Sequence, residues 1–399
     1  MTTKKLLLAA FCTTLMAGTA VATDVKIGVL NDRSGTYADL SGEGSVIAAR
    51  MAVEDFKAAD KGINVEIISA DHQNKPDVAS NIARQWYDQD GVDLIVDVPT
   101  SSAALAVSEV TGEKDKVFIN SGAGSTALTG AQCSPNTIHW TYDTYALAKG
   151  TGGAMVDQGN TDWFFITADY AFGHSLEEET TKVVKAAGGQ VLGTARHPFP
   201  GTDFSSYLLQ AQSSGADVIG LANAGGDTVN AIKQAAEFGI TQAGQKLAGL
   251  LIFITDVNAL GLEAAQGLVL TESFYWDLND DTRAWSKRFA EQHGGDMPTM
   301  VHAGVYSSVM HYLKAVEATG GKVTGDIMST MKQTPTDDAL LGKGMVREDG
   351  RKIHDMYLFQ VKSPAESKGP WDYYNVLATI PAEQAFRPMA EGGCNLVAQ

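Results

Sequence analysis

Cysteine is scarce in this chain of 399 residues, and sequence motifs of reaction chemistry are missing. The three cysteines are Cys12, Cys133 and Cys394. No G-x-S-x-G, H-E-x-x-H or C-x-x-C pattern occurs, which argues against a serine hydrolase, a zinc protease and a dithiol or zinc site. The eight histidines are scattered. We therefore expect no enzymatic activity, no metal and no cofactor.

Positive charge is also in short supply. Thirty Lys and Arg residues stand against 47 Asp and Glu residues, which gives a formal net charge of −17. Such a chain is repelled by nucleic acids and by anionic membrane surfaces, so neither is expected as a partner. A hydrophobic content of 44% over this length supports two domains with proper cores. We expect a freely diffusing monomer.

Long apolar runs are missing after the N-terminus. Lys4 and Lys5 precede an apolar stretch at 6–16, and small residues at 20–22 form a cleavage site. This pattern predicts a signal peptide over 1–22, which removes Cys12. No later segment has the roughly 18 apolar residues that a membrane helix needs. The mature chain is thus expected to be exported without membrane insertion, and in an oxidising compartment Cys133 and Cys394 are expected to form a disulfide.

Short runs rich in Val and Ile alternate with amphipathic segments. In the first half, strands are predicted at 25–30, 64–70, 93–98 and 116–120, and in the second half at 162–168, 190–199, 217–223, 250–255 and 267–273. Predicted helices lie between them, and others follow at 281–292 and 300–319. This alternation predicts two α/β units in tandem, each a doubly wound parallel sheet. Near the C-terminus, Asp349-Gly350 predicts a hairpin between 345–347 and 352–361, and 373–380 reads as a strand.

Small and hydroxylated residues follow several of these strands. Thr100, Ser101 and Ser102 come after the third strand, and Ala123, Gly124 and Ser125 come after the fourth. Loops of this kind let backbone N–H groups hold an anion. Tyr37 and Tyr170 occupy equivalent positions after the first strand of each unit. Because ligands of open parallel sheets bind at the carboxyl ends of the strands, both tyrosines are predicted to face one cleft.

The order of these segments resembles one known family. The chain contains IGVL at 27–30, SG at 34–35, AARMAVEDF at 48–56, TSS at 100–102, ADYAFG at 168–173 and IKQAAEFG at 232–239. From 25 to about 380 it is similar to the type I periplasmic solute-binding proteins of ABC importers, in the branched-chain amino acid group. The resemblance implies two lobes joined by three crossovers: the first lobe from 23–143 and 274–345, the second from 144–273 and 346–380, and a tail at 381–399 packed on the first lobe.

The resemblance also implies a location, a partner and a binding site. The location is the periplasm, and the partner is an ABC permease in the inner membrane. The family binds a ligand carboxylate on the first lobe, which points here to Thr100, Ser101, Ser102, Ala123, Gly124 and Ser125. An acidic or hydroxyl group on the second lobe holds the α-ammonium of amino-acid ligands. The corresponding segment 250–254 is apolar, and its nearest acid is Asp256.

Aromatic residues gather near the predicted strand ends and crossovers. They are Trp140, Tyr142, Tyr170, Phe172, Phe253, Phe274, Tyr275 and Trp276. This distribution resembles the branch of the family that binds aromatic acids, because such rings can sandwich another ring. The ligand site is therefore predicted to include Tyr37, Tyr170, Phe172, Phe253 and Tyr275, with Asn223 at the end of a second-unit strand.

Three alternatives stay open at this point. A branched-chain or other hydrophobic amino acid, or an amide, is the alternative ligand, with Asp169, Asp227 or Asp256 holding its ammonium. A receptor that serves a sensor instead of a permease would have the same two lobes. The residues GAGSTA at 122–127 also match the dinucleotide fingerprint G-x-G-x-x-A. Two features disfavour this dehydrogenase interpretation. Pro135 follows before any helix of useful length, and the preceding strand is the fourth of its unit, whereas the fingerprint follows a first strand.

Overall fold

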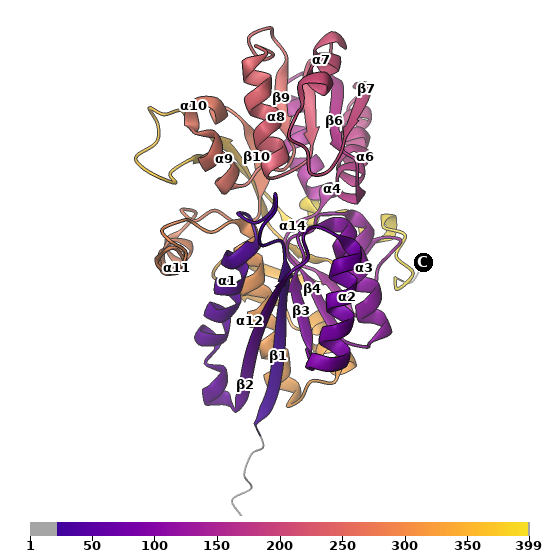
Figure 1. Ribbon diagram of the computed structural model, residues 1–399, viewed down its shortest axis with the longest axis vertical. Coiled ribbons are helices and arrows are strands. Elements are labelled where there is room, and N and C mark those ends of the chain that lie inside the picture. The colour runs from indigo at the N-terminus through magenta and orange to yellow at the C-terminus, as the bar shows by residue number, and fades with distance from the viewer. Residues whose placement is uncertain (1–21, 398–399) are drawn as a thin grey trace, which may run out of the picture.

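A parallel sheet of five strands forms the centre of the first lobe in the computed structural model, which describes residues 22–397 (Figure 1). Its order is β2-β1-β3-β4-β5, with bounds β1 Thr23–Asn31, β2 Ile63–Asp71, β3 Leu94–Asp97, β4 Val117–Asn120 and β5 Thr137–His139. Successive residues of these strands point to opposite faces, and both faces are apolar and buried. The predicted signal peptide lies outside the described residues, apart from Ala22.

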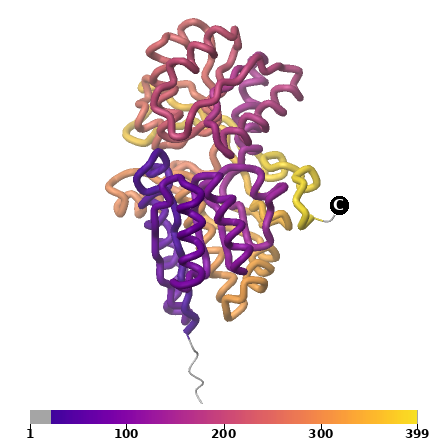
Figure 2. The backbone as a smooth tube through the Cα atoms, turned by 45° about the vertical axis from the view of Figure 1, so that its right-hand side comes forward, coloured from indigo at the N-terminus to yellow at the C-terminus, as the bar shows by residue number. Residues whose placement is uncertain are grey.

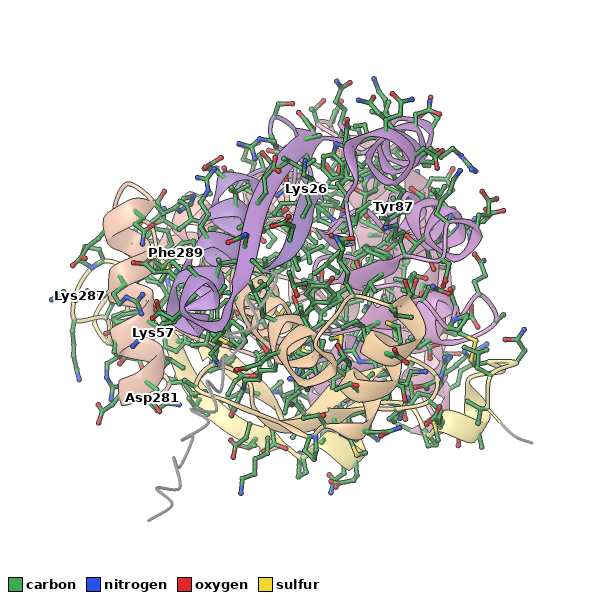
Figure 3. All side chains as sticks on the ribbon, turned by 90° about the horizontal axis from the view of Figure 1, so that it is seen from below. Lys26, Lys57, Tyr87, Asp281, Lys287 and Phe289 are labelled. Carbon is green, nitrogen blue, oxygen red and sulfur yellow. A yellow bond between two sulfur atoms is a disulfide. The ribbon has the colours of Figure 1, made fainter. Side chains whose placement is uncertain are left out.

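Helices cover both faces of this sheet. Helices α1 (Gly42–Phe56) and α12 (Met300–Thr319) pack on one face, and α2 (Pro76–Gln85) and α3 (Ser101–Glu113) pack on the other. Helix α11 (Asp280–Gln292) lies beside α1 at the edge of the lobe. Seen from below, its Phe289 points toward the core while Lys287 and Asp281 point outward (Figure 3).

The second lobe repeats this design with four parallel strands in the order β7-β6-β8-β9. The strands are β6 Asp162–Ala168, β7 Gln190–His197, β8 Val218–Ala222 and β9 Lys246–Gly249. Trp163 and Phe165 of β6 point toward α6 (Ala171–Ala186), and Phe164 and Ile166 point toward α7 (Ser205–Ser213) and α8 (Gly226–Glu237). The prediction of two α/β lobes is thereby confirmed.

Two antiparallel sheets complete the fold, and the sequence predicted several of their strands without the pairing that joins them. One combines β10 (Val269–Glu272), β14 (Met356–Val361) and β15 (Tyr374–Ile380), and the other combines β11 (Thr336–Asp338), β12 (Gly342–Val346) and β13 (Lys352–His354). The hairpin at Asp349-Gly350 joins β12 to β13 as expected. Arg351 also bridges His139 of β5. The chain therefore returns to the second lobe after His354, and the predicted return at 346 is too early.

The predicted strand at 250–255 is wrong. Strand β9 ends at Gly249, and helix α9 (Ile254–Leu260) follows after a short connection. The Phe253 N–H donates to Asp256 Oδ2 at 2.9 Å, which caps the start of α9. Residues 250–254 are all buried, and a short apolar run of this kind does not distinguish a strand from the start of a buried helix.

The remaining elements are short, apart from α13. They are α4 (Thr144–Leu147), α5 (Gly153–Asp157), α10 (Leu262–Ala265), α13 (Thr324–Gln333), α14 (Ala382–Ala385), η1 (Ala58–Lys61), η2 (Trp86–Asp90), η3 (Thr126–Thr129), η4 (Ala148–Gly152) and η5 (Met389–Glu391). Within residues 22–397, none of the helices has the length and apolar character that a bilayer crossing requires.

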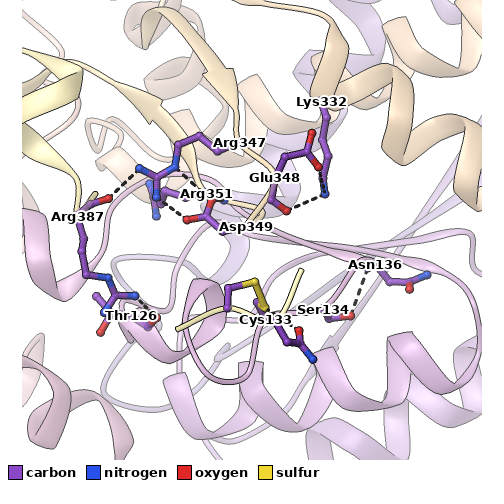
Figure 4. The surroundings of a disulfide bond; sticks show 12 residues. Thr126, Cys133, Ser134, Asn136, Lys332, Arg347, Glu348, Asp349, Arg351 and Arg387 are labelled. Carbon is purple, nitrogen blue, oxygen red and sulfur yellow. Dashed lines mark hydrogen bonds and ion pairs between the residues drawn. A yellow bond between two sulfur atoms is a disulfide. The ribbon is translucent and has the colours of Figure 1, made fainter. Parts of the chain in front are cut away.

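The C-terminal tail lies against the first lobe near the junction of the two lobes (Figure 2). Cys394 forms a disulfide with Cys133, with a Cα–Cα distance of 5.6 Å, and this is the pair that the sequence predicted (Figure 4). Phe386 is buried beneath the guanidinium of Arg351, and Arg387 donates to the Thr126 carbonyl at 3.3 Å. The tail is thus attached by one covalent bond and by contacts of two residues that precede it, Phe386 and Arg387.

Candidate ligand-binding site

A small cavity lies between the lobes, and we call it the interlobe cavity. Its lining residues all follow the carboxyl ends of parallel strands, as expected for this architecture. The first lobe supplies Tyr37, Leu40, Pro99, Gly122 and Tyr142, and the second lobe supplies Tyr170, Phe172, Ala224, Leu251 and Phe253. The volume is about 10 Å³, which is room for about one water molecule. The two lobes are therefore closed on each other in this structure.

Aromatic rings make direct contacts across the interlobe cavity. The hydroxyl oxygens of Tyr37 and Tyr170 lie 2.6 Å apart, within hydrogen-bond distance. Phe199, which follows β7, stacks on Tyr170 with ring centroids 4.2 Å apart and lies 5.3 Å from the Tyr37 ring. Tyr142 and Phe253 form a second pair across the lobes at 6.2 Å. The sequence placed Tyr37 and Tyr170 on one cleft, and the structure brings them together.

Backbone groups also join the lobes beside these rings. The Gly226 N–H, at the start of α8, donates to the Thr36 carbonyl at 3.4 Å. A Cβ on Gly226 would lie 2.7 Å from Thr36 Oγ1, and one on Gly225 would lie 2.6 Å from the Thr36 carbonyl oxygen. Such close approach requires glycine on the second lobe. Closure therefore depends on small residues at this point.

No charged side chain is among the residues that line the interlobe cavity. Burial raises the pKa of all three lining tyrosines, Tyr37, Tyr142 and Tyr170, above the ordinary value. Their hydroxyls are therefore neutral at physiological pH and can donate or accept hydrogen bonds. An anionic ligand in this position would be held by neutral donors instead of by a cation.

Two buried carboxyl groups lie just outside the lining. Asp227 accepts the Gly201 N–H through Oδ1 at 3.0 Å, and its Oδ2 is buried without a hydrogen-bond partner. Burial raises the pKa of Asp227 to about 7, and burial likewise raises the pKa of Asp256 to about 7. Burial is the main cause of the raised pKa of Tyr37 and Tyr170, and the nearby Asp227 carboxylate raises both further.

The predicted anion-holding loops lie next to the interlobe cavity without lining it. Thr100 donates its hydroxyl proton to the Asn74 side chain, and the Ser101 hydroxyl accepts the Ser125 N–H at 3.2 Å. Ala123 N–H donates to Asn120 Oδ1 at 3.0 Å. Ser102 lies in the first turn of α3. Their neighbours Pro99 and Gly122 form the wall, so a carboxylate-binding role for these loops stays a prediction.

Gly124 has a close packing role. A Cβ there would lie 2.9 Å from the Phe172 ring and 3.0 Å from the Tyr142 ring. The absence of a side chain therefore lets two rings of the cavity both pack against the backbone of this loop. A larger residue at this position would displace the rings.

Two other predicted site residues lie elsewhere. Asn223 donates to His197 Nε2 at 3.1 Å and accepts from the Thr228 hydroxyl, so its amide is hydrogen-bonded to two side chains within the second lobe. Tyr275 is buried in the second lobe's core and donates to the Trp371 carbonyl at 3.2 Å. Conversely, the site prediction did not include several lining residues, which are Leu40, Pro99, Gly122, Tyr142, Ala224 and Leu251. Tyr142 had a visible signal as an aromatic residue after a strand, and Gly122 had one as part of the glycine-rich segment at 122–127.

The residues of the cavity offer no reaction chemistry of their own. Among residues 22–397, no group of three or more His, Cys, Asp or Glu side chains is placed to hold a metal ion. The lining contains phenols, phenyl rings and aliphatic groups, which can enclose and orient a ligand.

The buried Asp227 carboxyl predicts a pH-dependent stability. Its pKa is about 7 in the folded protein and about 3.9 in an unfolded chain, so its stabilising contribution is present at pH 4 and is lost as pH rises through 7. Asp227→Asn keeps an oxygen for the Gly201 N–H. We expect it to raise the free energy of unfolding by roughly 2 kcal/mol at pH 8 and by much less at pH 5.

Urea unfolding at the two pH values measures this difference. The exposed Asp281, changed to Asn, is the control and should leave both values unchanged. Equal pH dependence in wild type and Asp227→Asn would contradict the expectation.

Comparison with known proteins agrees with this geometry. A family model described as periplasmic binding protein matches residues 24–370. The crystal structure of a periplasmic binding protein from Burkholderia mallei is 55% identical, has a TM-score of 0.91 and covers 94% of this chain and 99% of that chain. A branched chain amino acid ABC transporter periplasmic ligand-binding protein from Burkholderia xenovorans is 42% identical, with a TM-score of 0.83 and coverage of 93% and 99%.

A third solved structure shows the same fold at lower identity. It is an ABC transporter solute binding protein from R. palustris in complex with benzoate, 22% identical with a TM-score of 0.80, covering 90% of this chain and 97% of that chain. The family model spans most of the chain, and the Burkholderia mallei structure matches nearly all of it. The chain therefore belongs to the type I periplasmic binding proteins, the ligand-binding components of ABC transporters, which deliver small molecules to an inner-membrane permease and are not enzymes.

Proposed function

We propose that this protein captures a small aromatic carboxylate between its lobes and presents the closed form to an importer. The observation that carries the proposal is the lining of the interlobe cavity, where Tyr37, Tyr142, Tyr170, Phe172 and Phe253 meet without a charged side chain. Rings of this kind stack on a flat aromatic ligand. No acidic side chain lines the cavity to pair with an α-ammonium, which is what an amino-acid ligand requires.

The ligand enters through an open form. A cavity of about 10 Å³ does not admit an aromatic acid, so the lobes must separate and the rings must rearrange around the ligand. Rigid-body closure of two lobes around a ligand is a common motion of binding proteins. In this proposal the carboxylate is held by neutral donors of the first lobe, among them the hydroxyls of Ser101 and Ser102 and the N–H of Gly124, since the N–H groups of Ala123 and Ser125 already donate to Asn120 Oδ1 and to the Ser101 hydroxyl.

An amino acid is the second candidate ligand. Asp227 Oδ2 is buried without a hydrogen-bond partner, with His197 Nδ1 3.8 Å away, and a cationic group of a ligand near Tyr37 and Tyr170 would give it one. The Burkholderia xenovorans protein, 42% identical, is named for branched-chain amino acids. The choice between the two ligand classes depends on whether the second lobe contributes aromatic rings that stack on the ligand or a carboxylate that pairs with its ammonium group.

A thermal-shift screen tests the proposal. Benzoate, 4-hydroxybenzoate and cinnamate should stabilise the protein, whereas leucine, isoleucine and valine should not. A ligand present at about a hundred times its Kd adds about 2.7 kcal/mol to the free energy of unfolding, which the screen detects readily.

Matched variants make the screen specific for the cavity. Phe172→Leu should remove the shift caused by the aromatic acids, because it deletes a ring of the lining. Phe238→Leu alters a ring that is 40% exposed and remote from the cavity lining, so the shift should persist. Stabilisation by the branched-chain amino acids alone would reject the aromatic assignment and favour the second candidate.

A further inference from the structure

A buried carboxylate lies directly behind the first-lobe wall of the interlobe cavity. Asp97 is the last residue of β3, the central strand of the five-stranded sheet, and it is fully buried. Its Oδ2 accepts hydrogen bonds from Asn31 Nδ2 at 3.0 Å and from the Ser41 hydroxyl at 2.7 Å. Asn31 Nδ2 also donates to the Gly42 carbonyl at 2.7 Å. The carboxylate therefore joins the ends of β1 and β3 to the start of α1.

The backbone at this point has an uncommon conformation. Asp97 has φ of 82° and the next residue, Val98, has φ of 55°. Both values lie in the left-handed region, which a β-branched residue such as Val rarely adopts. Backbone strain of this kind persists only where surrounding contacts impose it, and it occurs often at ligand-binding sites. The contacts that impose it here include those of the Asp97 side chain and the Val98 N–H, which donates to the Leu30 carbonyl at 2.9 Å.

The loop after β4 is attached to the same residue. The N–H groups of Ser121 and Gly122 both donate to the Asp97 carbonyl oxygen, at 3.2 and 3.4 Å. A Cβ on Gly122 would lie 2.8 Å from Asp97 Oδ1 and 2.7 Å from Pro99 Cα. Gly122 therefore packs directly on Asp97, with no space for a side chain between them.

These contacts converge on three residues of the cavity lining. Leu40 is next to Ser41, Pro99 is two residues after Asp97, and Gly122 contacts Asp97 itself. The three come from separate segments of the chain, and Asp97 contacts all three segments. We propose that Asp97 is a positioning residue for ligand binding, which holds the segments carrying Leu40, Pro99 and Gly122 in the arrangement that forms the first-lobe wall.

Three variants and two measurements test this inference, which rests on the proposed use of the interlobe cavity. Asp97→Ala removes the carboxylate, and Asp97→Asn keeps an acceptor oxygen for Asn31 and Ser41 and tolerates the left-handed backbone. Asp93→Ala is the control, because Asp93 is a buried carboxylate just before the other end of the same strand and accepts the Lys26 N–H. Affinity for benzoate and leucine is measured by calorimetry, and amide hydrogen exchange is measured without ligand.

In Asp97→Ala, we expect ligand affinity to fall at least about thirty-fold and the Ser121 and Gly122 amides to exchange at least about ten-fold faster. Asp97→Asn should restore both to within about three-fold of wild type. Asp93→Ala should leave both unchanged, even if its melting temperature falls.

The exchange measurement is independent of the ligand. If wild type binds neither benzoate nor leucine, the proposed ligand classes fail, and the exchange rates alone decide the role of Asp97. Each of three results would overturn the inference. They are wild-type exchange rates of the Ser121 and Gly122 amides in Asp97→Ala, wild-type ligand affinity in Asp97→Ala, and equal changes in affinity and exchange in Asp97→Ala and Asp93→Ala.

Discussion

A Gly226→Val variant is expected to bind the ligand at least about 100-fold more weakly than wild type, a loss of about 2.7 kcal/mol of binding free energy. The Gly226 N–H donates to the Thr36 carbonyl across the lobes, and a Cβ there would lie only 2.7 Å from Thr36 Oγ1. The branched side chain therefore prevents the approach that brings Tyr37 and Tyr170 together. A ligand that binds the closed form can then do so only if the contact between Gly226 and Thr36 is distorted. This distortion costs free energy, so the affinity falls.

The stability of the two lobes should be nearly unaffected. The clash exists only when the lobes close, and an open form relieves it without unfolding. Gly325→Val is the matched control, since Gly325 also lies in the first turn of a helix and a Cβ there meets nothing within 4 Å. Calorimetric affinity and melting temperature are measured for both variants.

Two results would contradict this expectation. Wild-type affinity in Gly226→Val would show that the closed contact is not needed for binding. An equal loss of affinity in Gly325→Val would show that valine in a first helical turn is harmful by itself. Adding Thr36→Ala to Gly226→Val should recover part of the affinity, because it removes the nearest atom.

Much of the fold was predictable because strands and helices of this chain follow regular apolar patterns. The run at 162–168 and the stripe at 300–319 match β6 and α12 at both ends. Strands buried on both faces form continuous Val- and Ile-rich runs, and these are visible in a sequence. The apolar run at 250–255 has the same composition but connects β9 to α9, so composition alone misassigned it.

The topology near the C-terminus depended on contacts that the sequence does not display. Strands β13 and β14 are separated by one residue, Asp355, yet they belong to different sheets. Arg351 bridges His139, which keeps β13 with the first lobe, whereas β14 pairs with β10. A continuous predicted strand at 352–361 could not reveal this division.

The candidate site was predictable only where residues have a chemical signature. Tyr37 and Tyr170 repeat at equivalent positions in the two units, and their hydroxyls lie 2.6 Å apart. Leu40, Ala224 and Leu251 have small or aliphatic side chains that occur throughout the chain, and only the tertiary structure places them at the cavity. The hydroxyls of Thr100 and Ser101 drew attention as ligand-binding groups, but in this structure they bond to Asn74 and to the Ser125 N–H.

Loss of the disulfide is expected to have the largest effect on stability. Cys394→Ser should lower the free energy of unfolding by about 4 kcal/mol, because a bond between such distant residues restricts the unfolded chain strongly. Cys133 and Cys394 are 261 residues apart, so the closed loop includes the whole second lobe and the part of the first lobe from α11 to β13.

The folded tail retains other contacts when the bond is lost. Arg387 still donates to the Thr126 carbonyl, and Arg347 donates to the Arg387 carbonyl at 2.8 Å (Figure 4). Phe386 also remains buried. The folded state should therefore change little, and ligand affinity should stay near the wild-type value. Urea unfolding measures the loss, and wild type under a thiol reductant should match Cys394→Ser.

The double variant separates this effect from local packing. Cys133→Ser with Cys394→Ser should lose no more stability than Cys394→Ser alone, because both changes break one bond and their effects are not additive. A loss twice as large would show that each thiol contributes separately. A loss under about 1 kcal/mol in Cys394→Ser would reject the loop-closure account. It would mean that breaking the bond gives the unfolded chain little additional freedom, and that Phe386 and Arg387 hold the tail in the folded state.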